Sequence, residues 1–260
     1  MAETIPLLTL LTDFGSEDAY VGAMKGVILA RAPHTRIVDL THQIPHQDIH
    51  RAAFVLAEAA PWYPPGTVHV VVVDPGVGTS RRTLAATLDR QIVVAPDNGV
   101  ISRLWQAACE RNAWELASPS LGLPRRSATF HGRDLFAPVG ASLAAGELRA
   151  SDCGDPISPI LLPPAIPTIT RGRVEGVIIT QDHFGNLISC IRRSDLPEGP
   201  LQVSVDERAV DRWVETYGAA APGALVALFG SSNYLEVAAV NGDAARRLSV
   251  GVGARITVTW

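Results

Sequence analysis

The segment Val73–Arg82 (VDPGVGTSRR) combines residues whose types and spacing could do chemistry. Asp74 follows an apolar run, Pro75 fixes the backbone where the chain leaves that run, and two glycines permit a tight turn close to a ligand. Such a turn would bring Arg81 back toward Asp74. The segment lacks the third glycine of a dinucleotide fingerprint and the Gly-Lys-Ser/Thr triplet of a phosphate-binding loop. The alternative interpretation is an ordinary tight loop.

Other polar side chains follow apolar runs in the same way. Asp13 comes after the first run, and Asp97 and Asn98 come after a later one. Ligands of open α/β sheets bind beyond the carboxyl ends of the strands, so we expect these residues to converge on one edge. His131 opens a predicted helix within the sequence TFHGRD, a position that favours polar or anionic ligands. Taken singly, each aspartate is more simply a helix cap and the histidine a structural hydrogen-bonding group.

Three histidines, His42, His46 and His50, recur at every fourth position and raise the question of a metal site. Pro45 interrupts a helix face between the first two, and neither a cysteine nor a tight carboxylate cluster completes a ligand set. We therefore interpret them as surface histidines at a helix start and expect no metal.

Two polar segments in the second half of the chain could hold a base and a polar tail. In Asp182–Asn186 (DHFGN), Phe184 offers a stacking face and Asn186 offers both a donor and an acceptor, as an adenine edge requires. Ser231–Leu235 (SSNYL) places hydroxyls and an amide in a turn before a strand. The alternative for both is a loop of ordinary turn-forming residues.

These residues need a scaffold, and the first 150 or so residues alternate strand-like and helix-like patterns. Val-rich runs such as 68–73 are typical of strands covered on both faces, and Ser16 is a candidate N-cap for the first helix. The alternation predicts a layered α/β domain with a largely parallel sheet. The expected strands are 7–11, 36–40, 68–73 and 91–95, and the expected helices are 18–32, 48–60, one that follows residue 99 through 108, and 134–145.

Four prolines within residues 159–167 forbid regular helix and indicate a linker. Beyond them short β-rich runs recur between turn signals, which favours a small antiparallel barrel or sandwich. We therefore predict an α/β domain over 1–158, a linker over 159–170 and a β-barrel domain over 171–260. The expected strands of the second domain are 172–180, 201–205, 224–229, 234–239 and 254–259.

Composition narrows the classes of partner. The formal net charge of −4 provides no basic field for a phosphate backbone, so we expect no nucleic-acid partner. Cys109, Cys153 and Cys190 are odd in number and far apart, which suggests no disulfide framework and fits a reducing cytoplasm. The first residues lack the basic segment of a signal peptide, and no apolar run is long enough to span a membrane.

Taken together, the motifs resemble the S-adenosylmethionine (SAM) hydroxide adenosyltransferases, relatives of the bacterial fluorinase and chlorinase. The resemblance implies an α/β domain joined to a small β-barrel, a homotrimer, and a substrate held between one subunit's first domain and its neighbour's second. The motifs that carry it occur in order at Leu11–Gly15, Val73–Gly78, Ala95–Gly99, Phe130–Asp134, Asp182–Asn186 and Ser231–Leu235.

The same resemblance implies roles for individual residues. Asp74, Arg81 and His131 match the catalytic triad of the hydrolases. The halogenating relatives have a tyrosine in place of Asp74 and a different residue in place of His131. Asp13 matches the carboxylate that holds the ribose hydroxyls.

The remaining matches concern the rest of the substrate. The adenine contacts fall on Phe184 and Asn186, the ammonium contacts on Asp18 and Asp182, and the carboxylate contact near Ser231. Asn233 stands where the fluorinase has Arg and Gly, so the contacts to the methionine carboxylate depart from the family pattern. Asn98 belongs to the third motif and is also expected to contact the substrate.

The expected function is hydrolysis of SAM to adenosine and L-methionine by activated water at the 5′-carbon, with SAM as substrate and no cofactor. The sulfonium departs as a neutral thioether and needs no general acid, while Arg81 could stabilise developing hydroxide and His131 or Asp74 could take the proton. The alternatives are a SAM-dependent halide transferase and a non-catalytic adenosine- or SAM-binding module. A metal-dependent phosphohydrolase would need a second carboxylate two residues after Asp13, where Gly15 stands.

Overall fold

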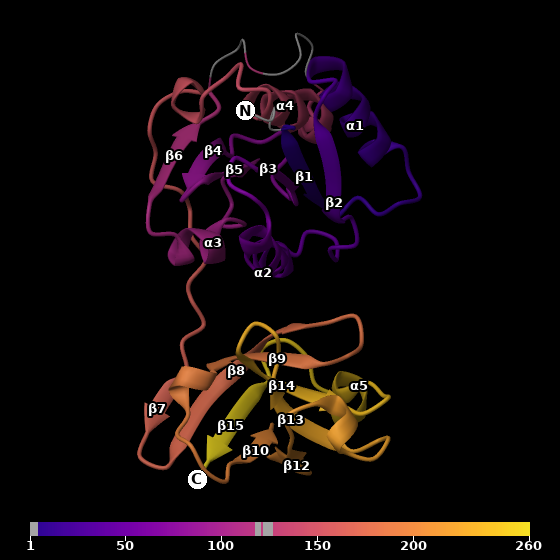
Figure 1. Cartoon of the computed structure of the whole chain (residues 1–260), viewed down its shortest axis with the longest axis vertical. Coiled ribbons are helices and arrows are strands. Elements are labelled where there is room, and N and C mark those ends of the chain that lie inside the picture. Colours follow the sequence, from indigo (N-terminus) through magenta and orange to yellow (C-terminus); the bar gives the residue numbers. More distant parts are fainter. Residues whose placement is uncertain (1–4, 118–120, 122–126) are drawn as a thin grey trace. The chain divides into compact units, whose positions relative to one another are not determined.

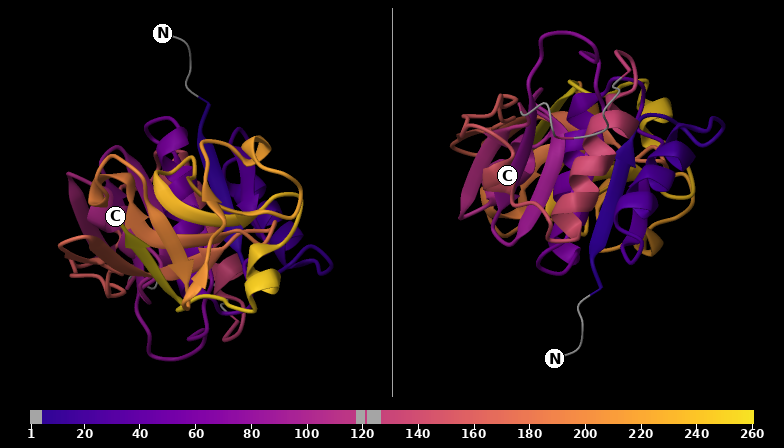
Figure 2. Two further views of the ribbon diagram at one scale, coloured as in Figure 1. Left: turned by 90° about the horizontal axis from the view of Figure 1, so that it is seen from below. Right: turned by 90° about the horizontal axis from the view of Figure 1, so that it is seen from above.

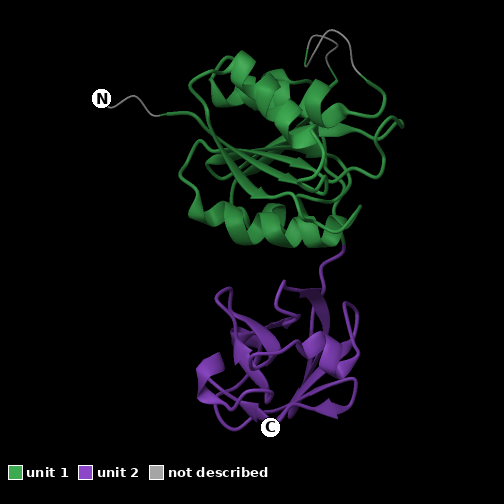
Figure 3. Cartoon of the chain, turned by 90° about the vertical axis from the view of Figure 1, so that its right-hand side faces the viewer, with its two compact units in different colours: residues 1–162 green, residues 163–260 purple. Residues whose placement is uncertain are grey.

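The computed structural model describes residues 5–117, 121 and 127–260, and the chain divides into two compact units, residues 1–162 and 163–260 (Figure 3). The first unit is an α/β layer structure around a six-stranded sheet of order β2-β1-β3-β5-β4-β6 (Figure 1). β2, β1, β3 and β5 pair in parallel, whereas β4 is antiparallel to both of its neighbours. The strands are β1 Leu7–Thr12, β2 Arg36–Thr41, β3 Val68–Val72, β4 Thr83–Leu88, β5 Gln91–Pro96 and β6 Arg111–Glu115.

Helices cover both faces of this sheet, which explains why its central strands are apolar on both sides. One apolar core joins alternate strand residues such as Leu8 and Val70 to α1 and α4, and a second joins Leu11 and Val71 to α2 and α3. α1 and α4 also lie against each other (Figure 2). The helices are α1 Tyr20–Arg31, α2 Ile49–Ala59, α3 Ser102–Ala107 and α4 Ala137–Ala144, the last preceded by a π-helical turn at Gly132–Phe136.

The ends of the strands and helices predicted in the first unit are confirmed within two or three residues. Two further strands were not predicted, and one predicted helix cap is wrong. β4 and β6 were not expected, because the small residues of TLAATL and the polar RNAWE carry little strand signal. Ser16 as the cap of the first helix is wrong: α1 begins only at Tyr20, and its N-cap residue Ala19 makes no side-chain hydrogen bond. By contrast α2 does have a side-chain cap, since the Asp48 carboxylate accepts from Arg51 N–H.

The second unit holds a nine-stranded, mostly antiparallel sheet with a short helix, α5 Ala244–Leu248. Its order is β11-β10-β15-β8-β9-β14-β13-β12, with β7 paired to β8, and no pairing among the described residues joins β11 to β12. β9 was missed because its sequence follows directly on a turn motif. The strands are β7 Thr168–Thr170, β8 Arg173–Gln181, β9 Leu187–Arg192, β10 Gln202–Val205, β11 Arg208–Ala209, β12 Arg212–Trp213, β13 Leu225–Phe229, β14 Tyr234–Ala239 and β15 Arg255–Thr259.

The segment between the two sheets is bound to the first unit at its start. Ile160 N–H donates to the buried Asp97 carboxylate at 2.7 Å, and Leu162 N–H donates to the Ser102 hydroxyl at 2.7 Å. The same carboxylate pairs with Arg82 at 2.6 Å. None of the helices in the described part of the chain is long and apolar enough to cross a membrane.

His69 makes the stability of the first unit depend on pH. It lies fully buried in β3, with Nδ1 at 2.7 Å from the Thr9 hydroxyl and its ring edge-on to Tyr63. Burial lowers the pKa of His69 to about 4, an effect that nearby Gln91 partly offsets. The folded protein therefore holds this ring neutral where the unfolded chain would protonate it.

We expect acid to unfold the protein in part through this residue. Because the unfolded ring binds a proton below about pH 6.5 and the folded ring only below about pH 4, stability falls as the pH drops through that window. Between pH 7 and pH 4.5 the loss from His69 should be roughly 2–3 kcal/mol. Urea denaturation of the protein and of His69→Gln at both pH values measures it, with the exposed His50→Gln as control. An equal pH dependence in all three proteins would contradict the assignment.

Candidate active site

A cavity of about 300 Å³ opens at the carboxyl ends of β1 and β3 in the first unit. It is lined by residues of three loops and one helix start, which are far apart in the sequence. These are Asp13, Phe14, Asp18 and Tyr20 after β1, His46 and Gln47 before α2, Val72, Asp74 and Val77 at the end of β3, and Thr129–Gly132 before α4. The edge of the sheet that the sequence indicated is therefore hollowed.

Asp74 and His131 line this cavity, and Arg81, which is not among the lining residues, lies between them as the centre of a three-residue contact. Its Nε donates to both oxygens of Asp74, at 2.9 and 3.1 Å, and its Nη2 also contacts Asp74 Oδ2. The same Nη2 lies 2.8 Å from Nδ1 of His131. The side chains of Asp74 and Arg81 are 5% and 12% exposed, so the ion pair is largely withdrawn from water. The structure thus brings together the three residues that the sequence singled out for catalysis.

This contact fixes the protonation of His131. A guanidinium has only donors, so the Nδ1 that faces Arg81 must be an acceptor. The ring is then neutral and carries its proton on Nε2. In this arrangement His131 restrains Arg81 and holds no basic lone pair, whereas the Asp74 carboxylate keeps acceptor capacity.

The turn that returns Arg81 to Asp74 depends on glycine. Val77 N–H donates to the Asp74 carbonyl and Thr79 N–H to the Gly76 carbonyl, which closes the turn. Gly78 has φ of +77°, and a Cβ there would lie 2.4 Å from the Ala128 carbonyl oxygen. Only glycine satisfies both conditions, so the turn packs directly on the segment before His131.

A second buried charge holds the helix start that carries His131. Asp134 is fully buried, accepts from Ser127 N–H at 2.7 Å and pairs with Arg133. The hydrogen bond from Arg133 is the main reason that the pKa of Asp134 lies below its usual value, and burial opposes it. The side chain therefore stays ionised and anchors the turn before α4.

Asp13 reaches the cavity from the loop after β1, where its Oδ2 accepts from Gln47 N–H at 2.9 Å. Gln47 itself has φ of +63°. Asp18 lines the same cavity from an exposed position. Asn98 is not among the lining residues; its amide donates to the Val73 carbonyl at 2.9 Å and ties the end of β5 to the end of β3.

Several lining residues went unrecognised in the sequence. The rings of Phe14, Tyr20 and Phe130 form one aromatic cluster, with centroids 5.2–6.0 Å apart, and their spacing along the chain gives no sign of it. His46 also lines the cavity, from an exposed position that agrees with the surface placement expected from the sequence. The described residues include no group of three His, Cys, Asp or Glu side chains that could hold a metal ion.

In the second unit, Asp182 organises the turn that the sequence assigned to adenine. It accepts from Phe184 N–H and Asn186 N–H, both at 2.9 Å, and from the Asn186 amide at 2.8 Å. Phe184 is 72% exposed, so its ring is available for stacking, while Asn186 is buried. One amide hydrogen of Asn186 is thus used within the turn, and its carbonyl oxygen keeps acceptor capacity.

The other predicted segment of the second unit is the turn between β13 and β14. Ser231 and Asn233 are both exposed there, and Asn233 has φ of +61°. Beneath them lies a residue that the sequence did not suggest, Glu236, which is buried, accepts from the Tyr217 hydroxyl and lies against Gly230. Burial is the main reason that the pKa of Glu236 is raised.

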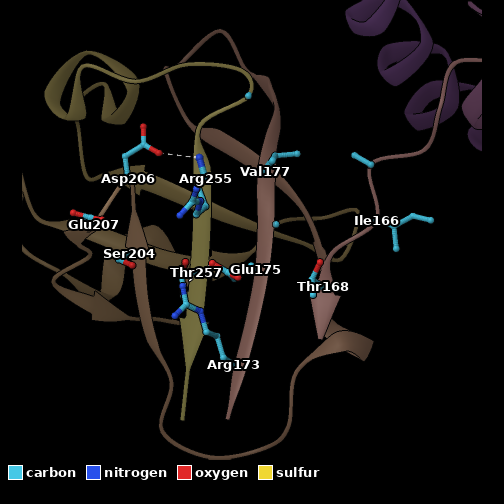
Figure 4. Close-up of a pocket in the computed structure, with 13 residues that line it drawn as sticks. Ile166, Thr168, Arg173, Glu175, Val177, Ser204, Asp206, Glu207, Arg255 and Thr257 are labelled. Carbon is cyan, nitrogen blue, oxygen red and sulfur yellow. Dashed lines mark hydrogen bonds and ion pairs between the residues drawn. The ribbon is translucent and has the colours of Figure 1, made fainter. Parts of the chain in front are cut away.

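A larger hollow of about 1060 Å³ lies on the face of β8, β10 and β15 (Figure 4). Three of its charged side chains are engaged with one another or with backbone: Arg173 pairs with Glu175 at 2.6 Å, and Asp206 accepts from Arg255 N–H at 2.9 Å. None of the residues predicted to bind substrate lines this hollow. The cavity around Asp74 is therefore the better candidate for chemistry.

Comparison with known proteins identifies the family of the chain. Residues 8–154 match the model of the SAM hydroxide adenosyltransferase N-terminal domain, and residues 176–257 match that of the C-terminal domain. An (R)-S-adenosyl-L-methionine hydrolase of Salinispora tropica is 40% identical, over 100% of this chain and 99% of its own. A fluorinase of Actinoplanes sp. is 25% identical, over 98% and 97%. The crystal structure of an uncharacterized conserved protein from Thermotoga maritima superimposes with a TM-score of 0.91 at 33% identity, covering 97% of this chain and 100% of that one.

We expect Gly78→Ala to damage the turn more than its backbone conformation alone explains. Gly66 is a matched control, because it also has a positive φ, of +86°, but a Cβ there would meet no atom within 4 Å. Gly66→Ala should cost about 1–2 kcal/mol in the free energy of unfolding. Gly78→Ala should cost roughly 1–3 kcal/mol more, because the Ala128 carbonyl must move. Urea denaturation measures both, and equal losses would show that the contact with Ala128 is unimportant.

Proposed function

The chain belongs to the SAM hydroxide adenosyltransferase family, and we propose that it hydrolyses (R)-S-adenosyl-L-methionine to adenosine and L-methionine. The observation that carries this proposal is the contact of Arg81 with both Asp74 and His131, two residues that line one cavity. A relative with the hydrolase name matches this chain over its full length, and the fluorinase relative is less similar.

The reaction needs little from the protein beyond a placed nucleophile. A water oxygen forms a bond to the 5′-carbon of SAM while the carbon–sulfur bond breaks, and its electron pair neutralises the sulfonium. Because the leaving group is a neutral thioether, no proton has to be donated to it. The task that remains is to hold water in line with the breaking bond and to remove its proton.

We assign this task to the three residues, and their contacts support the assignment. Arg81 supplies a fixed positive charge toward which hydroxide character develops on the attacking oxygen. His131 accepts from Arg81 through Nδ1 and so holds the guanidinium in place. Asp74 is then the proton acceptor, because its carboxylate alone of the three keeps basic lone pairs in this arrangement. Its negative charge also disfavours a halide as the nucleophile.

The substrate residues that we propose are divided between the two units. In the first, Asp13 holds the ribose hydroxyls and Asp18 the ammonium group, with Asn98 at the edge of the site. In the second, Phe184 and Asn186 take the adenine, while Asp182, Ser231 and Asn233 take the amino-acid end. This division supports a homotrimer in which neighbouring subunits complete each site.

We further propose that the reaction needs no metal or other cofactor. The neutral leaving group supports this, since no developing negative charge on it requires a Lewis acid. The protein's partners are then its small-molecule substrate and copies of itself, and its three free cysteines support a cytoplasmic location.

The first expected outcome concerns the reaction itself. Purified protein mixed with SAM should release adenosine and methionine in equal amounts, at the same rate with or without excess EDTA. Chromatography of the nucleoside products measures this, and chloride or fluoride added to parallel reactions tests halide transfer. A preference for 5′-halo-5′-deoxyadenosine, or binding of adenosine without turnover, would overturn the proposed function. Loss of the rate in EDTA that one divalent ion restores would overturn the metal-free mechanism alone.

The second outcome assigns the proton acceptor. Asp74→Ala, Arg81→Ala and His131→Ala should each lower kcat by roughly 10²–10⁴-fold, and the losses should be strongly non-additive when combined. Asp74→Asn should be as poor as Asp74→Ala, because an amide is not a base. His131→Asn should keep kcat within about tenfold of the parent, because its oxygen can replace Nδ1 as an acceptor for Arg81.

Adenosine affinity provides the control for these variants. It should stay near the parent value in the Asp74 and His131 variants, whereas Asp13→Ala and Asn186→Ala should weaken it and raise KM. A His131→Asn enzyme as inactive as His131→Ala would make His131 the base and contradict the assignment to Asp74.

A further inference from the structure

His42 contacts the loop that carries Asp13 at two points, although it does not line the cavity itself. Its carbonyl oxygen accepts from Gly15 N–H at 2.8 Å. Its ring Nδ1 lies 2.9 Å from the hydroxyl of Thr12, the last residue of β1. Both contacts join the segment after β2 to the segment after β1, which are neighbouring parallel strands.

The hydrogens of this contact can be assigned from burial. The Thr12 hydroxyl is fully buried, and its oxygen accepts from Phe14 N–H at 3.2 Å. The hydroxyl proton also needs an acceptor in such a place, and His42 Nδ1 is in reach. His42 Nδ1 therefore accepts this hydrogen bond and carries no proton, and the ring proton is on Nε2.

Asp39 favours that state of the ring. Nε2 lies 3.1 Å from Asp39 Oδ1, so the carboxylate attracts the proton on that nitrogen, although the two atoms are not aligned for a hydrogen bond. Lys25 binds the other oxygen of Asp39 at 2.6 Å. Burial raises the pKa of Asp39, but the contacts with Lys25 and His42 outweigh that effect and hold the pKa below its usual value.

The consequence is a defined position for Asp13. This residue lies between Thr12 and Phe14, both of which take part in the hydrogen-bonded chain. Its own carboxylate is held by Gln47 N–H, which belongs to the segment that follows His42. The loop after β1 and the loop after β2 therefore hold each other in place where Asp13 and Gln47 line the cavity.

We propose that His42, acting through the Thr12 hydroxyl, is a positioning residue that holds the Asp13 loop for binding of the nucleoside half of the substrate. This inference rests on the proposed function for the identity of the ligand. It assigns to His42 a hydrogen-bonding role in place of metal binding or simple surface exposure.

Two conservative variants separate the ring's two nitrogens. His42→Asn places an amide oxygen near the position of Nδ1 and keeps an acceptor for Thr12, whereas His42→Gln reaches the position of Nε2 and loses that acceptor. We expect His42→Gln to raise the adenosine Kd and the KM for SAM roughly three- to tenfold, the effect of one hydrogen bond, with kcat nearly unchanged. His42→Asn should restore most of the affinity. Titration calorimetry and initial rates measure both.

Thr12 supplies an independent pair of variants. Thr12→Val removes the hydroxyl at nearly constant volume and should match His42→Gln, while Thr12→Ser keeps the hydroxyl and should match the parent. The double variant Thr12→Val/His42→Gln should lose little more than either single one, because both remove the same bond. His50→Asn and His50→Gln, on the exposed side of α2, control for loss of a histidine.

A measurement without ligand keeps this test separate from the proposed function. Amide hydrogen exchange of Phe14 and Gly15 should accelerate in His42→Gln and Thr12→Val but not in His42→Asn or Thr12→Ser. Unchanged exchange and unchanged adenosine affinity in folded His42→Gln would overturn this inference while leaving the hydrolase in place. Accelerated exchange in His42→Gln and Thr12→Val, together with a parent protein that never forms adenosine, would retain the positioning role and overturn the function.

Discussion

The guanidinium of Arg81 is the group on which the candidate site depends. It bonds to a carboxylate at the end of β3 and to an imidazole at the start of the helix before α4. A buried ion pair costs desolvation energy that its own attraction barely repays, so both partners must be held in good geometry by the rest of the fold. The Phe136 ring under the guanidinium and the turn through Gly78 provide that support. Removing either end of the pair would leave an unpaired charge.

The sheet, which is covered on both faces, stabilises the fold enough to tolerate such a buried ion pair. Its central strands are buried on both faces, and the two cores that flank it are apolar. Polar groups are concentrated instead where the strands end, together with positive φ values at Gly78 and Gln47. Strain and buried charge therefore lie on the loops, while the elements below them supply the free energy of folding. Glycine weakens the interior of a strand, but in the turn after β3 it is required, because Gly78 has a positive φ and lies against Ala128.

Much of the first unit could be predicted because its signals are local. Strand exits in β1, β3 and β5 are marked by Asp13, Asp74 and Asp97, and parallel pairing brings them to one edge. The aromatic cluster of Phe14, Tyr20 and Phe130 could not be predicted, since it forms only when the loop after β1 meets the helix start. β4 was missed for a related reason: it is an antiparallel strand of small residues, whose burial comes from neighbours on both sides and not from its own hydropathy.

Histidine shows most clearly where sequence reasoning stops. His42, His69 and His131 each use Nδ1 in a hydrogen bond, yet their surroundings give them three different tasks. His69 meets Thr9 within a buried strand and is kept neutral by burial, and His42 meets a buried hydroxyl. His131 meets a permanent cation, so its Nδ1 is the acceptor of that contact. The sequence alone allows a histidine to be a metal ligand, a surface group or a base. In the structure, the hydrogen-bond partner of Nδ1 decides which role each histidine can take. For His131 that partner supports our proposal that Asp74 accepts the proton from water. Because the thioether leaves as a neutral group, the proposed reaction needs no general acid.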